Sequence, residues 1–128
     1  MTFPDLSLVV VVGLAGSAGA LTRYLLSRFF AERISPNFPF GTLFINISGA
    51  FLIGLLFSLA ARGVISTNVQ LILATGFMGG YTTFSTMSWE GVQLARGGRL
   101  GSSIFYLGGN VVPGLLVAAL GLWLGWRI

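Results

Sequence analysis

The stretch Gly76–Glu90, GFMGGYTTFSTMSWE, decides the fold, because it interrupts a chain that is otherwise built from long apolar runs. It follows the apolar run VQLILAT (69–75) and brings adjacent glycines and several hydroxyl side chains to a place where an unbroken helix is expected. The surrounding chain has 128 residues, of which 55% are hydrophobic and only 8% are charged. So few charges are not typical of a soluble domain. We therefore expect an integral membrane protein.

Four segments are long and apolar enough to cross a membrane, since a spanning helix needs about 20 largely apolar residues. They cover about 6–29, 41–61, 69–94 and 100–126, and we expect them to form one all-α transmembrane domain over residues 1–128. The connections are short, so consecutive helices must run antiparallel and both termini lie on one side of the membrane. An acidic residue, Asp5, precedes the first apolar run. A cleaved signal peptide normally has a basic start, so we expect this segment to remain as a span.

Composition also limits the class of function. The net charge of +4 comes from seven arginines, scattered singly between apolar runs, against three acids. This pattern favours arginines that flank membrane spans over a nucleic-acid-binding surface. The chain has no His and no Cys, which argues against an enzyme and against thiolate metal sites. The glycine-rich GLAGSAG (13–19) does not follow a strand, so close helix packing is a better interpretation than a nucleotide-binding loop.

The interruption falls near the middle of the third span. At 1.5 Å per residue, the rise from Val69 to Gly79 is about 15 Å, half of a hydrocarbon core about 30 Å thick. We therefore predict a third helix that is broken near the bilayer midplane, with backbone groups exposed where the two halves meet. Such groups must face protein or water, and a discontinuity of this kind often marks an ion or substrate site. A glycine kink, with Thr and Ser hydroxyls bonded back to the helix, is the simpler alternative.

Other polar residues converge on the half of the bilayer opposite the termini. Thr42 and Asn46 share one face of the second span, and Tyr106 and Asn110 share one face of the fourth. The segment between the interruption and that side also contains Phe84, Ser85 and Met87. One chain thus supplies half of a polar path, and an inverted second copy would supply the other half. The arginine bias, four against two, is too weak to fix one orientation, so insertion in both orientations is possible.

Each of these residues also has a purely structural interpretation. A buried asparagine such as Asn46 or Asn110 often bonds only to a neighbouring helix, and Phe84, Met87 and Tyr106 could simply be packing residues. We place Glu90 about 12 Å beyond the midplane, where a carboxylate extending to the vestibule is favoured over a buried proton carrier. Arg23 could extend to the headgroups or face a water-filled mouth.

Three segments of the chain resemble a known family. GSAGALTRYLLS (16–27) in the first span, GTLFINISGAFLIG (41–54) in the second and GGYTTFST (79–86) in the third are similar to the Fluc (CrcB) fluoride channels of microbes. The resemblance implies an antiparallel, dual-topology homodimer in the cell membrane (inner or plasma membrane), with two fluoride pores. It also implies a structural sodium ion at the dimer centre, held by the backbone carbonyls of Gly79 and Thr82.

The same resemblance assigns roles to individual residues. Asn46 would line the pore, Phe84 would be the first of two pore phenylalanines, and Tyr106 would begin a polar track on the fourth helix. Arg23 and Glu90 match an arginine and a glutamate of the family, which we place in the vestibule. Three positions depart from the pattern: Met87 replaces the second phenylalanine, Asn110 replaces a serine of the track, and Gly114 offers no hydroxyl at the next position. These departures put the conductance and the detailed ion positions in doubt.

The sequence therefore predicts a channel for passive fluoride efflux that protects against fluoride toxicity, with Asn46, Phe84, Met87, Tyr106, Asn110, Thr42 and Ser85 along the ion pathway. The alternative is a small dual-topology exporter of drugs or cations that is coupled to protons. Such a transporter needs a membrane-embedded carboxylate. Only Glu90 is available, and we expect it to be in the wrong span for this role and too near the surface. A subunit with a purely structural role would not need the interrupted helix.

Overall fold

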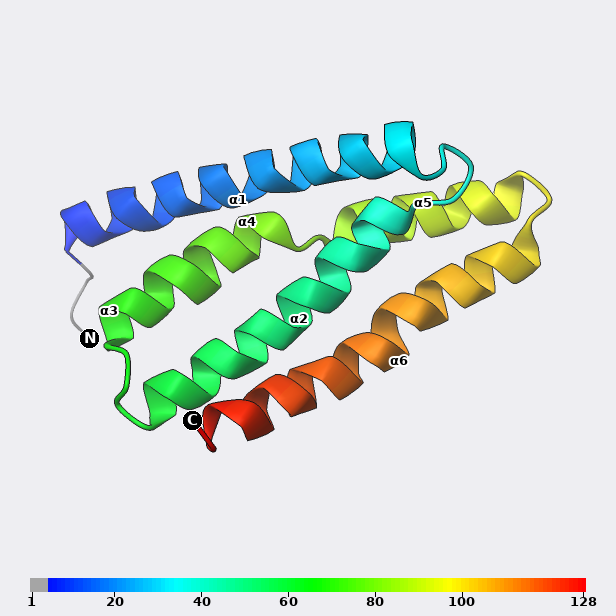
Figure 1. Cartoon of the computed structure of the whole chain (residues 1–128). Coiled ribbons are helices and arrows are strands. Elements are labelled where there is room, and N and C mark those ends of the chain that lie inside the picture. Colours follow the sequence, from blue (N-terminus) through cyan, green and yellow to red (C-terminus); the bar gives the residue numbers. More distant parts are fainter. Residues whose placement is uncertain (1–4) are drawn as a thin grey trace.

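The computed structural model describes residues 5–128, and within them every regular element is a helix (Figure 1). We expected the first segment to remain as a span and not to be cleaved as a signal peptide. The start of the chain ahead of that segment, residues 1–4, lies outside the described residues. Three helices are long and apolar enough to cross a membrane. These are α1 (Leu6–Arg33), α2 (Phe40–Ala61) and α6 (Leu100–Gly125). The third predicted segment consists of shorter pieces: α3 (Thr67–Gln70), the π-helix η1 (Leu71–Met78), α4 (Gly79–Tyr81) and α5 (Phe84–Arg96).

Local sequence explains where several of these helices begin and end. The Asp5 carboxylate accepts hydrogen bonds from the backbone N–H and the hydroxyl of Ser7, which cap α1 and lower the pKa of Asp5. The Ser66 hydroxyl caps α3 by accepting from the Val69 N–H, 3.2 Å away. Gly63 and Gly98 follow α2 and α5 with φ of 74° and 77°, a backbone conformation that favours glycine after a helix end.

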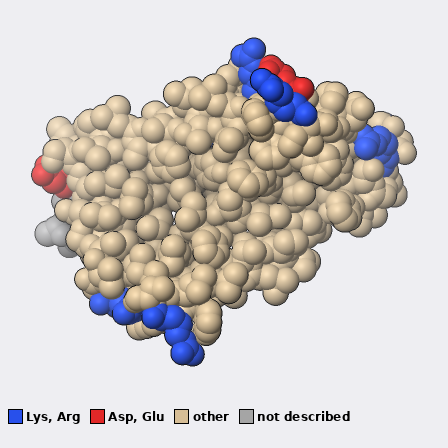
Figure 2. Space-filling view, viewed as in Figure 1, with Lys and Arg blue, Asp and Glu red and all other residues tan. Residues whose placement is uncertain are grey.

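The four helical segments lie side by side. The start of α1, the C-terminus and the α2–α3 connection lie at one end of the bundle, whereas the α1–α2 and α5–α6 connections lie at the other (Figure 1). Figure 2 shows the charged atoms in a few small clusters at the periphery, with a broad uncharged surface between them. This arrangement suits a bundle whose middle faces lipid. With its three long apolar helices, the chain is a multi-pass membrane protein.

Glycines allow the helices to approach closely, which confirms the packing interpretation of GLAGSAG. A Cβ on Gly19 of α1 would overlap the carbonyl oxygen of Phe77 in η1, and one on Gly80 would overlap the carbonyl oxygen of Gly16. On the other side of the bundle, Gly54 of α2 and Gly121 of α6 are packed in the same way against the facing backbone. Small residues at helix contacts are the usual means of tight packing within a bilayer.

The predicted interruption of the third helix is confirmed, but it does not lie at the twin glycines. Gly79 and Gly80 are helical, and the chain becomes extended only at Thr82 (ψ 155°) and Thr83 (φ −151°, ψ 119°). Gly80 is needed for the contact with α1 and not for an unusual backbone conformation. The interruption, called the helix break below, therefore consists of Thr82 and Thr83.

Candidate functional site

The helix break is held by the side chain of Asn46, which projects from α2. Asn46 Oδ1 accepts a hydrogen bond from the Thr83 N–H at 2.9 Å, and Asn46 Nδ2 donates to the Thr83 carbonyl oxygen at 3.0 Å. The side-chain amide thus pairs with both backbone groups of one residue, as a neighbouring strand would. The Thr83 hydroxyl in turn accepts from the Thr86 N–H at 3.1 Å and caps α5.

The other half of the break is held from α1 and from the helix itself. Arg23 Nε donates to the carbonyl oxygen of Gly80 at 3.1 Å. The N–H and the hydroxyl of Thr82 both donate to the Met78 carbonyl oxygen at 2.9 Å. A hydroxyl bonded back to its own helix is therefore present as well, but it accompanies a true break of the backbone.

Two carbonyl oxygens at the break receive none of these hydrogen bonds. Among the side-chain, turn and cap hydrogen bonds of residues 5–128, none ends on the carbonyl oxygen of Gly79 or of Thr82. In an unbroken helix the Gly79 carbonyl would accept from the Thr83 N–H. That N–H is bonded to Asn46 instead. Both carbonyls are thus able to accept a hydrogen bond or to contact a cation.

A groove of about 270 Å³, called the break groove below, opens on the surface of the chain beside Thr82 and Thr83. It brings five of the predicted site residues together from α2, the break, α5 and α6: Asn46, Thr82, Phe84, Met87 and Asn110. The Phe84 side chain is 78% exposed, whereas Met87 is 7% exposed and packs against Tyr106 and Leu94. Phe84 is therefore largely exposed at the groove, whereas Met87 is almost fully covered.

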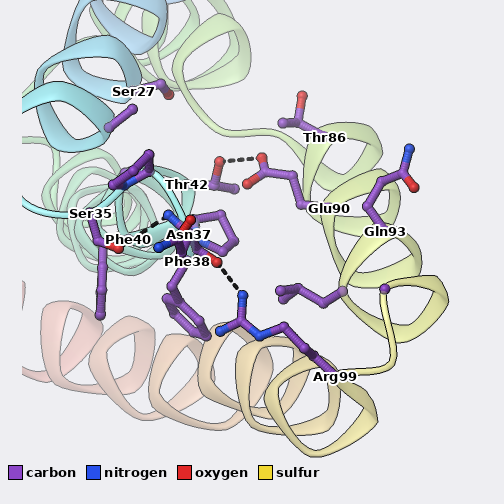
Figure 3. A pocket seen from close by; sticks show the side chains of 16 residues that line it. Ser27, Ser35, Asn37, Phe38, Phe40, Thr42, Thr86, Glu90, Gln93 and Arg99 are labelled. Atoms are coloured by element: carbon purple, nitrogen blue, oxygen red, sulfur yellow. Dashed lines mark hydrogen bonds between the residues drawn. The ribbon is translucent and has the colours of Figure 1, made fainter.

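Thr42 and Glu90 lie in a second cavity of about 500 Å³ at the end of the bundle that carries the α1–α2 connection. The Thr42 hydroxyl donates to Glu90 Oε1 at 2.7 Å, and Figure 3 shows the two side chains facing each other from α2 and α5. Arg99 and Gln93 line the same cavity. The structure therefore places the Glu90 carboxylate inside this cavity and not at the break.

The Tyr106 side chain lies between the two cavities. It is fully buried, packs in the cluster with Met87, and meets the Phe38 ring edge-on at 5.6 Å between centroids. Its hydroxyl is the one buried side-chain polar atom of the described residues without a hydrogen-bond partner. Ser85 is exposed near the groove, with its hydroxyl 3.3 Å from that of Thr83.

Comparison with known proteins places this site in a family. The family described as CrcB-like protein, Camphor Resistance (CrcB), matches residues 10–122, which include both cavities and the break. The chain belongs to the CrcB family. Two CrcB relatives are the "Fluoride-specific ion channel FluC 2" of Moorella thermoacetica, 48% identical over 90% of each chain, and the "Fluoride-specific ion channel FluC" of Hydrogenobaculum sp., 49% identical over 92% of this chain and 95% of the relative. A relative with the latter name from Thermus thermophilus is 42% identical over 91% of each chain.

Sequence reasoning missed two features of this CrcB site. Thr83 was not among the predicted residues, although a Thr directly before the first apolar residue of a helix is a recognisable capping signal. The contact between Arg23 and the Gly80 carbonyl was also missed, because depth along a helix does not say which backbone group a long side chain can reach. Both residues act on the backbone at the break.

Proposed function

We propose that this chain is a fluoride-specific ion channel, through which fluoride leaves the cell passively and toxicity is relieved. The observation that carries the proposal is the near full-length similarity to CrcB relatives named fluoride-specific ion channels, within which the break groove lies. A weak acid that enters uncharged and ionises inside is trapped as its anion, so a passive anion pathway lowers the internal concentration. The membrane in question would be the cell (inner or plasma) membrane.

The proposed pathway uses hydrogen-bond donors that carry no fixed charge. Fluoride is small and strongly hydrated, so a pore must replace its water with other donors. The pathway would be lined by Asn46 and Asn110 beside the break, with Asn110 as the amide donor, and would run towards Thr42 at the cavity of Glu90. Further donors are the hydroxyls of Tyr106 and Ser85 and the electropositive ring edge of Phe84, with Met87 beside them. An anion held by neutral donors is bound weakly enough to leave.

We propose that two copies assemble as an antiparallel dimer with dual topology. The break groove is open on the surface of one chain, and Phe84 is 78% exposed within it. The proposed path leads from the break groove towards the cavity of Thr42 and Glu90, at one end of the bundle. An inverted second copy would cover the groove and supply the polar residues of the other half. Arg23, which reaches the break, and Glu90, which lies in the outer cavity, would belong to the vestibules.

A structural sodium ion is proposed for the centre of this dimer. The free carbonyl oxygens of Gly79 and Thr82 fit such an ion, because unwound backbone carbonyls in membrane proteins are suitable ligands for Na⁺. Two such oxygens from each copy would give four hard ligands without any carboxylate. When bound, the cation would balance the carbonyl dipoles that meet at the two breaks.

Ion-specific efflux from liposomes tests the proposed function. Purified protein would be reconstituted into vesicles loaded with potassium fluoride or with potassium chloride. With valinomycin present, so that potassium can follow the anion, an ion-selective electrode would record the release of each anion. We expect rapid fluoride release and chloride release close to that of protein-free vesicles. Equal release of both anions, or no fluoride release from correctly folded protein, would contradict the proposal.

A further inference from the structure

We propose that Asn46 and Asn110 form a positioning pair, in which Asn46 holds the backbone of the helix break and Asn110 holds Asn46 in the orientation that this requires. Asn110, and not Asn46, then has an amide N–H to offer to the ion. Only the statement that Asn110 donates to an ion rests on the proposed function. The pairing of Asn46 with Asn110 consists of hydrogen bonds within one chain and does not depend on it.

The orientation of both amides follows from the backbone. An N–H can only donate and a carbonyl can only accept, so the two bonds to Thr83 fix which end of the Asn46 amide is oxygen and which is nitrogen. The second N–H of Asn46 points at Asn110, 2.9 Å away, which must therefore present its oxygen. The Asn110 nitrogen is then turned to the Tyr106 carbonyl oxygen, to which it donates at 2.8 Å.

Counting donors shows which amide is still available. A side-chain amide has two N–H groups. Asn46 uses both, one on Thr83 and one on Asn110, so it has none left without breaking an existing bond. Asn110 uses one, on Tyr106, and lines the break groove. The second N–H of Asn110 is thus the side-chain amide donor that this groove can offer.

The backbone at the break explains why such a pair is needed. Thr83 is buried, and its extended conformation turns its N–H away from the Gly79 carbonyl that would receive it in a continuous helix. A buried backbone group without a partner is costly. Asn46 supplies that partner, and in doing so it leaves the Gly79 carbonyl free. The same side chain therefore both stabilises the break and sets which carbonyl stays open.

Hydrogen exchange at Thr83 tests the pair in the full chain, reconstituted in lipid nanodiscs. Asn46→Ala removes the acceptor of the Thr83 N–H, so we expect exchange at Thr83 to become about tenfold faster or more. Asn110→Ala should give a smaller acceleration, and the double variant should be no faster than Asn46→Ala alone, since Asn110 acts through Asn46. Ser48→Ala, on the same helix as Asn46, is the matched control: it removes a hydroxyl that pairs with the Tyr81 hydroxyl of α4 at 3.0 Å, and it should leave exchange at Thr83 unchanged.

Two further measurements distinguish a failure of the proposed pair from misfolding of a variant and from a failure of the proposed function. Asn46→Asp retains an acceptor for the Thr83 N–H, so Thr83 should stay protected in it even if Asn46→Ala fails to fold. Wild-type exchange rates at Thr83 in Asn46→Ala, lost protection in Asn46→Asp, or additive effects of the two alanines would each overturn the pair. Fluoride efflux is measured on the same protein preparations reconstituted into liposomes: if the wild-type chain releases none, the proposed function fails while the result at Thr83 still decides the pairing.

Discussion

At the scale of single residues, the site combines neutral amides and hydroxyls with one half-buried carboxylate. Asn46 contacts the break, whereas Glu90 is bonded to Thr42 in the outer cavity. The two side chains thus lie in different cavities, and a channel and a proton-coupled exporter depend on them in opposite ways. A channel needs the amide at the break, and an exporter needs a carboxylate that exchanges protons.

Asn46→Asp should abolish fluoride efflux from liposomes while the protein still elutes as the wild type does. The substitution keeps the size of the side chain, but it places a negative charge and only acceptors where an anion must pass. Glu90→Gln is the companion variant and should retain substantial flux. If Asn46→Asp conducts normally and Glu90→Gln is inactive, the exporter becomes the better account.

Much of the site could be predicted at this scale, because spacing and depth are enough to bring polar side chains to one face. Asn46, Phe84, Met87 and Asn110 were all expected along the pathway, and all four line the break groove. What spacing could not predict is the bonding of each group. That the Asn46 amide is already used by Thr83 depends on the backbone angles of Thr82 and Thr83, which no periodicity encodes.

At the scale of elements, the four helical segments could be predicted from the sequence, whereas the position of the break could not. Long apolar runs allowed the segments to be predicted, since composition alone favours helices that can cross a bilayer. The break was expected at the glycines and lies after them, because Gly80 serves the packing of α4 on α1. A glycine in a sequence does not reveal whether it provides backbone freedom or space.

Gly80→Ala should destabilise the protein by about 1–3 kcal/mol, because the added methyl group would overlap the backbone of Gly16 in α1. Gly108→Ala is the control, since a Cβ at this position of α6 meets nothing within 4 Å. It should be neutral or slightly stabilising, because alanine favours helix. The free energy of unfolding in detergent compares the two variants. A harmless Gly80→Ala would contradict the close contact of α1 with α4.

The two halves of the third helix also predict a dependence on cations. If the free carbonyls of Gly79 and Thr82 hold sodium, then replacing sodium on both sides of the membrane with a bulky organic cation should impair folding or fluoride flux. Flux and melting temperature in the two media provide the measurement. Indifference of both to the identity of the cation would argue against such a site.

At the scale of the whole molecule, the proposed path runs from the break groove towards the cavity of Thr42 and Glu90, and the break groove opens on the surface of the chain. Dual topology follows if a second, inverted copy completes the path. Reporter fusions at the C-terminus should therefore give signals from both sides of the membrane in cells. A single orientation in every fusion would contradict the antiparallel dimer.

The most direct test of the central claim, that this chain is a passive fluoride channel, asks whether fluoride leaves alone and carries charge. Vesicles containing the wild-type protein and potassium fluoride are diluted into a medium without fluoride, and a fluoride electrode follows the release. A channel lets the anion out until the membrane potential stops it, so we predict little release at first and a rapid burst when valinomycin lets potassium follow. Fluoride release that needs no valinomycin and follows an imposed proton gradient would contradict the account.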